Sequence, residues 1–211
     1  MYRSVIIVDD FYPEPERVRA AALALDYPPP RPGQNHAGRN SATRLIVTGV
    51  DEAVSEIVGE PLVGNTRVAH GRCRLAFAGD EGRFNVHIDE DTVWAGIVYL
   101  NLPEHCRGGT VLFRHRPSAS DRAPITPEEM KRFGVARPED AVARVLEDDA
   151  NDPEKWQEMT TLPMRFNRLV LIRPWFWHSA GPSFGDSPET ARLIQLFFFV
   201  HPPESAPAAH P

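Results

Sequence analysis

Short apolar runs separated by turn-forming residues dominate the chain from residue 66 onward. These runs are rich in β-branched and aromatic residues, and Gly, Pro, Asp or Asn stand between them, as is typical of strands in antiparallel sheets. They are TRVAHGRCRLAFAG, GRFNVHIDED, TVWAGIVYLNL, GTVLFRHR, RFNRLVLIRP and TARLIQLFFFVH. The pattern predicts a mainly β fold with two packed sheets or an open barrel.

The first 60 residues carry a different pattern. SVIIVDD predicts a short strand, and PEPERVRAAALALDY has apolar residues at helical spacing. A second short helix is predicted in DEAVSEIVGE, where Asp51 is the candidate cap and Val54, Ile57 and Val58 share a face. We therefore expect one strand and two helices before the sheet system begins.

A long segment interrupts the strand series between FRHR and RFNRLVLI. It contains two helix start signals: a capping box formed by Thr126 and Glu129, and Pro138 at a first-turn position. Residues 126–158 carry ten acidic and five basic residues. Two interpretations are open: a solvated acidic insertion, or a lid over the mouth of the barrel.

The length of 211 residues is that of one domain. We expect a single domain over 1–200 with a helical insertion over 117–163, and a proline-rich disordered tail over 201–211. No stretch approaches the roughly 20 apolar residues of a membrane span, and the N-terminus lacks a secretory signal. The sequence thus predicts a cytoplasmic protein without a membrane partner.

Charge and cysteine content narrow the chemistry. The formal net charge is −6 and the basic residues are scattered, which argues against nucleic acid as a partner. The two cysteines, Cys73 and Cys106, have no cysteine nearby, so neither a disulfide framework nor a CxxC zinc site is indicated. Any metal site must use histidine and carboxylate ligands.

The stretch FNVHIDED offers such ligands. Side chains alternate between the two faces of a strand, so His87 and Asp89 are expected to project the same way. The candidate third ligand is His178, at the end of the apolar run LVLIRP. Two histidines and one carboxylate form a facial triad that suits iron(II) and leaves coordination positions open. Because an HxD triplet by itself is common, the prediction depends on the features that follow it.

Those features include an arginine at the head of an apolar run. After HxD come YLN, a GG turn before TVLF, the distal His178, and Arg192 at the head of the last apolar run. An open iron site that activates oxygen needs a two-electron donor such as 2-oxoglutarate, whose far carboxylate requires a fixed cation. Arginine suits this role because its planar fork binds a carboxylate through two hydrogen bonds. We predict that Arg192 is this cation.

The set WAGIVYLN, GGTVLF, His178 and Arg192 resembles the core of the iron(II)- and 2-oxoglutarate-dependent dioxygenases. It is most similar to the prolyl-hydroxylase-like branch, and RFNRLVL and HSA resemble a bacterial group in the superfamily without assigned function. The similarity covers roughly residues 66–200. It implies a double-stranded β-helix, or jelly roll, with N-terminal helices packed against one sheet.

The resemblance also implies residue roles and an activity. The implied iron ligands and catalytic residues are His87, Asp89 and His178, and the residues that contact 2-oxoglutarate are Arg192 and Tyr99. Such an enzyme consumes O2 and hydroxylates an amino-acid-like small molecule or a peptide, with succinate and CO2 as co-products. Halogenating relatives replace the carboxylate ligand with a small residue, so the Asp in HxD favours hydroxylation.

Some positions depart from the superfamily pattern. The spacing from His178 to Arg192 is longer than usual, and Leu196 and Phe77 stand where relatives often have Thr and Tyr. Two alternatives therefore remain open: a cupin-like protein that binds a metal or ligand without oxidation, and a metal-dependent isomerase or lyase.

Cationic residues near the expected mouth suggest how a substrate is held. The candidate substrate residues are Arg83, Asn85, Arg114, Arg116 and Trp177. The arginines suit a carboxylate-bearing substrate such as an amino acid or a peptide terminus. The competing interpretation is that they are surface charges or pair with the acidic insertion, and that the tryptophan packs in the core.

Overall fold

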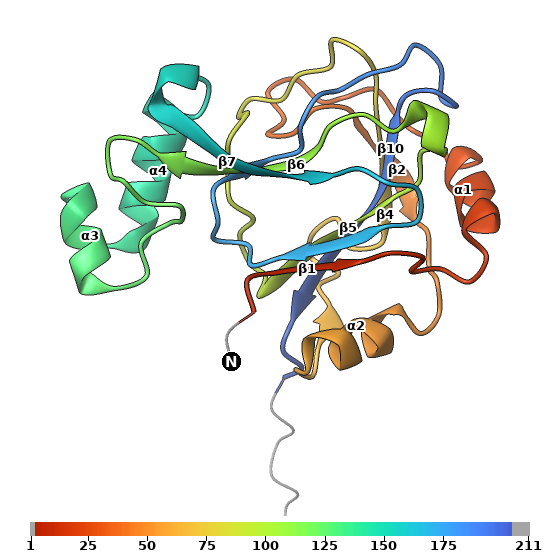
Figure 1. Ribbon diagram of the computed structural model, residues 1–211, viewed down its shortest axis with the longest axis horizontal. Helices are drawn as coiled ribbons and strands as arrows, with labels where there is room; N and C mark the ends of the chain where they lie inside the picture. The colour runs from red at the N-terminus through yellow and green to blue at the C-terminus, as the bar shows by residue number, and fades with distance from the viewer. Residues whose placement is uncertain (1–2, 204–211) are drawn as a thin grey trace, which may run out of the picture.

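The structure, a computed structural model, describes residues 3–203 and contains two antiparallel sheets (Figure 1). The strands of the seven-stranded sheet are β1 (Val5–Val8), β2 (Arg39–Arg44), β3 (Val63–Gly64), β4 (Arg72–Ala76), β5 (Trp94–Tyr99), β8 (Leu169–Ile172) and β10 (Arg192–Val200). They lie in the order β1-β8-β5-β10-β4-β2, with β3 also paired to β10. The smaller sheet has the order β7-β6-β9 and consists of β6 (Gly109–His115), β7 (Trp156–Pro163) and β9 (His178–Ser179). The predicted mainly β, antiparallel architecture is confirmed, and it is consistent with a jelly-roll-like fold.

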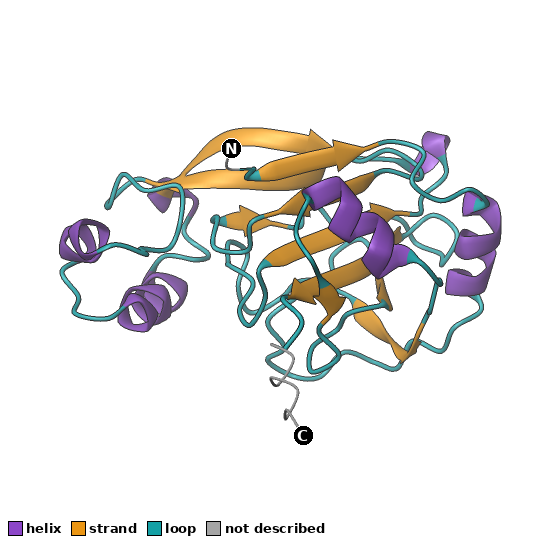
Figure 2. Ribbon diagram, turned by 90° about the horizontal axis from the view of Figure 1, so that it is seen from below, coloured by secondary structure: helices purple, strands orange, loops and turns teal. Residues whose placement is uncertain are grey.

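Helices lie in two places (Figure 2). Helices α1 (Pro15–Leu23) and α2 (Val50–Val58) pack against one face of the larger sheet, where Ala22 and Val54 are fully buried with strand residues. Helices α3 (Pro127–Phe133) and α4 (Pro138–Asp148) form a separate pair at one end of the molecule. Within residues 3–203, no helix has the length and apolar character needed to cross a membrane.

The predicted helix signals are confirmed with one exception. The Thr126 side chain and Glu129 form the capping box of α3, and Pro138 begins α4. The prediction that Asp51 caps α2 is wrong, because Gly49 occupies the cap position. The Asp51 carboxylate instead accepts a hydrogen bond of 2.7 Å from the backbone N–H of Gly64, which ties α2 to β3.

Strand β10 lies between two hydrophobic cores. Leu193, Phe197 and Phe199 belong to the core beneath α1 and α2, whereas Ile194 and Leu196 belong to a core shared with residues of the smaller sheet. Successive strand side chains point to opposite faces, so a strand buried on both sides is apolar at nearly every position. This is why RLIQLFFFV reads as an almost continuous apolar run.

One predicted boundary differs in the structure. The α-helices of the insertion predicted over 117–163 end at Asp148 and are followed by a short 3-10 helix, Pro153–Lys155. The last part of that segment is β7, paired with β6. The sequence WQEMTTLP is polar because four consecutive residues of the strand, 157–160, are exposed, so the apolar-run criterion missed it. The tail predicted over 201–211 lies, from residue 204, outside the described residues.

Gly181 makes a close approach that holds β9 beside β6. Its φ is +77°, and a Cβ on it would collide with the carbonyl oxygen of Gly109. We expect Gly181→Ala to lower the free energy of unfolding by about 2–4 kcal/mol. Gly59→Ala is the matched control, because Gly59 has a φ of +78° and open space around it; it should cost only about 1 kcal/mol. Urea denaturation of both variants measures the difference, and equal losses would contradict a steric role for Gly181.

Candidate metal centre

His87 and His178 are brought together by a pair of backbone hydrogen bonds. The N–H of each residue donates to the carbonyl of the other at 2.9 Å, in an isolated antiparallel bridge. The two imidazole rings consequently lie side by side, with centroids 4.5 Å apart. The N–H of Asp89 donates to the carbonyl of Pro174 at 3.0 Å, which fixes the third residue.

The prediction that His87 and Asp89 lie on a regular strand is wrong. Apart from the bridge at His87, residues 81–91 form no strand, and Asp91 has a φ of +56° that turns the chain away. The predicted convergence nevertheless holds. One ligand atom from each of His87, Asp89 and His178 lies within 4.8 Å of the others, and His178 Nε2 is 3.3 Å from Asp89 Oδ2.

Backbone carbonyls orient both imidazoles. His178 Nδ1 lies 2.9 Å from the carbonyl oxygen of Phe176, and His87 Nδ1 lies 3.3 Å from that of Asn85. A carbonyl oxygen only accepts, so these contacts place the proton on Nδ1 of each ring. In the neutral form of each ring, Nε2 then has a free lone pair. Such fixing of the tautomer by an outer hydrogen bond is typical of metal-binding histidines.

The charges of the three side chains are strongly coupled. Burial lowers the pKa of His87 to about 4, assisted by the neighbouring His178. Burial acts in the same direction on His178, but the Asp89 carboxylate outweighs it and raises the pKa of His178. For Asp89, burial would raise the pKa, yet the charge and hydrogen bond of His178 lower it. The Asp89 carboxylate therefore favours the protonated form of His178, whereas burial favours the neutral form of His87.

This arrangement predicts the pH dependence of metal binding. A metal must displace the proton from His178, so affinity should fall as pH falls below the raised pKa of that residue, by roughly tenfold per pH unit. His87 stays neutral down to about pH 4 and contributes no second proton. Nickel(II) affinity measured by chelator competition between about pH 5 and 6 should give a slope of one in log K against pH. A slope of two would contradict the assignment of protons.

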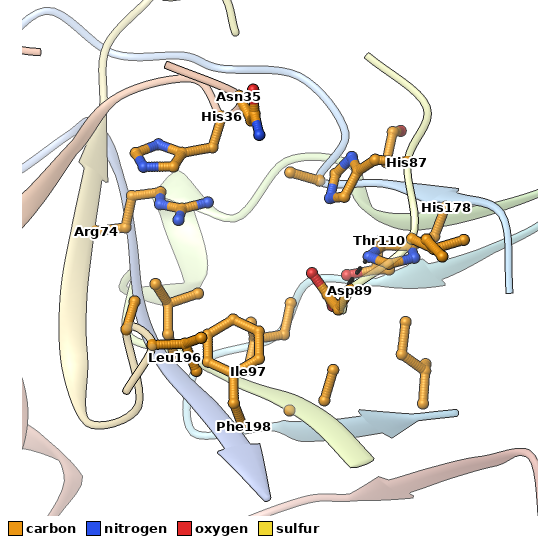
Figure 3. A pocket seen from close by; sticks show the side chains of 18 of the residues that line it. Asn35, His36, Arg74, His87, Asp89, Ile97, Thr110, His178, Leu196 and Phe198 are labelled. Carbon is orange, nitrogen blue, oxygen red and sulfur yellow. Dashed lines mark ion pairs between the residues drawn. The ribbon is translucent and has the colours of Figure 1, made fainter. Parts of the chain in front are cut away.

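The three side chains line a cavity of about 410 Å³ between the sheets. Figure 3 shows them on one side of the cavity, with His36 and Arg74 on the opposite side and an apolar wall of Ile97, Leu196 and Phe198. The donor set of two imidazoles and one carboxylate is the one that non-haem iron(II) sites use. The residues present therefore fit iron(II).

Arg192 lies on the cavity wall with part of its guanidinium unused. The residue is only 3% exposed, and its Nη2 has no hydrogen-bond partner within residues 3–203. Its guanidinium carbon is 6.0 Å from the centre of the Tyr99 ring. Burial lowers the pKa of Arg192, although an arginine remains charged near neutral pH. A buried cation in this state is suited to bind an anion that enters the cavity.

Tyr99 lies behind this wall rather than on it. Its hydroxyl accepts a hydrogen bond from the backbone N–H of Thr110 and lies 2.9 Å from Thr110 Oγ1. Thr110 lines the cavity and Tyr99 does not. The predicted contact of Tyr99 with a ligand stays a prediction, and Thr110 is the nearer hydroxyl to the cavity space.

None of the candidate substrate residues lines the 410 Å³ cavity of the triad. Arg83 is exposed and forms an ion pair of 3.7 Å with Glu147 of α4, the pairing with the acidic insertion that the competing interpretation expected. Arg114 and Arg116 are exposed, and Trp177 is fully buried in the core beneath α3 and α4. Asn85 lines a second, adjoining cavity of about 590 Å³.

Sequence reasoning missed a polar group on the far wall. Arg74 of β4 donates from Nε to Asn40 Oδ1 at 2.8 Å, and the Asn40 amide nitrogen lies 3.3 Å from His36 Nε2. Burial, and then the charge of Arg192, lower the pKa of Arg74 to about 9. The signal that could have found it is an arginine in the middle of a strand whose neighbours Cys73 and Leu75 are core residues.

Comparison with known proteins gives a family and matches to solved structures at low identity. A model described as "Family of unknown function (DUF6445)" matches residues 2–199. A search of curated proteins finds no match. The structure of HygX from Streptomyces hygroscopicus with nickel and 2-oxoglutarate bound is 14% identical, with a TM-score of 0.44 over 94% of this chain and 83% of HygX. The non-haem iron oxygenase OrfP in complex with Fe is 13% identical, with a TM-score of 0.37 over 87% of this chain and 77% of OrfP.

Proposed function

Since this chain belongs to DUF6445, a family of unknown function, its activity has to be inferred from its own site, and we propose an iron(II)- and 2-oxoglutarate-dependent oxygenase. The observation that carries the proposal is the convergence of His87, Asp89 and His178 within 4.8 Å on a cavity that also contains a buried arginine with an unused donor. The triad suits iron(II), and the arginine suits the carboxylate of a co-substrate.

His87, Asp89 and His178 would hold the metal. His87 and His178 offer neutral Nε2 atoms once His178 has lost its proton, and Asp89 offers a carboxylate oxygen. When bound, iron(II) and 2-oxoglutarate supply the activation of O2 that places one oxygen atom in the substrate and one in succinate, with release of CO2. The retained carboxylate of Asp89 favours hydroxylation over halogenation.

Arg192 and the apolar wall set the environment of this chemistry. Arg192 would bind a carboxylate of 2-oxoglutarate, and the nearby Thr110 and Tyr99 hydroxyls would assist it. Ile97, Leu196 and Phe198 exclude water from the cavity, and this strengthens the attraction between the arginine and the carboxylate.

We further assign the two sheets to the double-stranded β-helix of the prolyl-hydroxylase-like branch.

Binding and turnover with purified protein test the proposal. Anaerobic addition of iron(II) and 2-oxoglutarate should produce a weak visible charge-transfer band, and admission of air should produce succinate from 2-oxoglutarate. Omission of either iron or 2-oxoglutarate is the control. A folded protein that gives neither the band nor succinate would rule out the oxygenase, and metal binding without 2-oxoglutarate binding would favour the cupin-like alternative.

A further inference from the structure

Arg74 is a second cation on the cavity wall. It projects from β4 toward the triad across the cavity (Figure 3). Arg74 pairs in register with Ile194 on the neighbouring β10, two residues from Arg192, so the two arginines share one face of the sheet. The charge of Arg192 disfavours the charged form of Arg74 and the Asp89 carboxylate favours it, and a bound anion would further relieve the repulsion between the two arginines.

A polar chain positions this guanidinium. The Asn40 Oδ1 accepts from Arg74 Nε, and the Asn40 amide donates to His36 Nε2. His36 Nδ1 in turn lies 3.2 Å from the carbonyl oxygen of Ala37, so the ring carries its proton there and is neutral. Burial and the Arg74 charge lower the pKa of His36 to about 4, in agreement with this tautomer.

The outer edge of the guanidinium is not engaged by the protein. Among residues 3–203, no carboxylate lies within 4.0 Å of Arg74, and no hydrogen bond involves its two terminal nitrogens. Nε is held by Asn40, so Nη1 and Nη2 remain as a pair of parallel donors. This geometry matches the two oxygens of a carboxylate.

Charge balance points in the same direction. In the proposed loaded site, iron(II) brings two positive charges, and Arg74 and Arg192 bring one each. Asp89 and 2-oxoglutarate together bring three negative charges, which leaves one positive charge on the cavity wall. A single substrate carboxylate would neutralise it.

Arg74 also lies where two cavities meet. It lines both the 410 Å³ cavity of the triad and the adjoining 590 Å³ cavity, as do His36, Phe84 and His87. A molecule anchored here can extend into the second cavity while it remains next to the metal ligands. Resting on the proposed function, we propose that the substrate is an amino acid whose carboxylate binds Arg74. Its ammonium group would face the acidic residues Asp80 and Glu81, which line the second cavity.

Ligand binding to nickel(II)-loaded protein tests this without turnover. After saturation with 2-oxoglutarate, the twenty protein amino acids and their carboxamides are titrated by calorimetry and thermal shift. We expect at least one amino acid to bind, its carboxamide to bind roughly tenfold or more weakly, and Arg74→Gln to weaken the amino acid roughly 10–100-fold. Arg74→Lys keeps the positive charge but loses the two parallel donors, so its amino acid affinity should lie between those of the wild type and Arg74→Gln. Arg67→Gln, at an exposed arginine outside both cavities, should change nothing.

The outcomes separate the two proposals. Wild-type protein that binds neither nickel(II) nor 2-oxoglutarate refutes the proposed function itself. If both bind but no amino acid does, or if Arg74→Gln leaves the amino acid affinity unchanged, the substrate assignment alone is refuted. A loss of 2-oxoglutarate affinity in Arg74→Gln as large as the loss of amino acid affinity would instead place Arg74 in the co-substrate site.

Discussion

His178→Ala is expected to lower iron(II) affinity by more than about hundredfold and to reduce succinate formation to the level of metal-free protein. Loss of an outer hydrogen-bond partner of a metal ligand already costs 10–100-fold in affinity, and removal of a ligand costs more. His178 is also the residue that carries the proton beside Asp89. Its loss leaves that carboxylate with a single imidazole neighbour and breaks the three-ligand set. Metal titration by calorimetry and a succinate assay measure the two effects.

The control is a histidine outside the site. His201 has a side chain 55% exposed, and its contacts are long: 3.4 Å from Nδ1 to the Pro61 carbonyl oxygen and 4.0 Å from Nε2 to the Glu60 carboxylate. His201→Ala should therefore leave iron affinity and succinate formation unchanged. Circular dichroism checks that both variants are folded. Iron binding of wild-type strength in folded His178→Ala would eliminate the triad as the metal site.

The sequence correctly indicated that His87, Asp89 and His178 converge, but not the backbone structure that brings them together. His87 and Asp89 were placed on one face of a strand, but in the structure an irregular segment carries them. Their proximity comes from the bridge between His87 and His178 and from the contact of Asp89 with Pro174. These are pairings between segments about 90 residues apart. Local periodicity contains no information about which distant segments pair. The order of the motifs indicated this pairing only because it resembles the order in the dioxygenases.

Long-range register also explains what sequence reasoning missed. TRVAHGRCRLAFAG contains Arg67, Arg72 and Arg74, and the choice among them depends on how β4 aligns with β10. That alignment places Arg74 opposite Ile194 on the cavity face, whereas Arg67 is exposed. In contrast, the buried position of Arg192 followed from its place at the head of an apolar run. A single arginine in an apolar run, such as Arg192, is easily identified as unusual, whereas Arg74 lies in a stretch with two other arginines.

Replacement of Arg192 by leucine should separate stability from ligand binding. Two charge-assisted hydrogen bonds to a carboxylate are lost, so 2-oxoglutarate affinity of the nickel(II)-loaded protein should fall at least about hundredfold. The free energy of unfolding should stay the same or rise by about 1 kcal/mol, because a buried cation with an unpartnered Nη2 is replaced by an apolar side chain. Calorimetric titration and urea denaturation give the two quantities.

Arg19→Leu is the matched control for this prediction. Arg19 is a buried arginine of α1, 7% exposed, that donates to the carbonyl oxygens of Leu100 and Glu189 at 2.7 and 2.8 Å. Its loss leaves two carbonyls unsatisfied and should lower the free energy of unfolding by about 2 kcal/mol, with no change in 2-oxoglutarate affinity. Arg19→Leu should therefore lower the free energy of unfolding without affecting 2-oxoglutarate affinity, and Arg192→Leu should lower the affinity without lowering the free energy of unfolding. If Arg192→Leu destabilises the protein as Arg19→Leu does and 2-oxoglutarate still binds, Arg192 is a structural residue and the cavity has no co-substrate cation at that position.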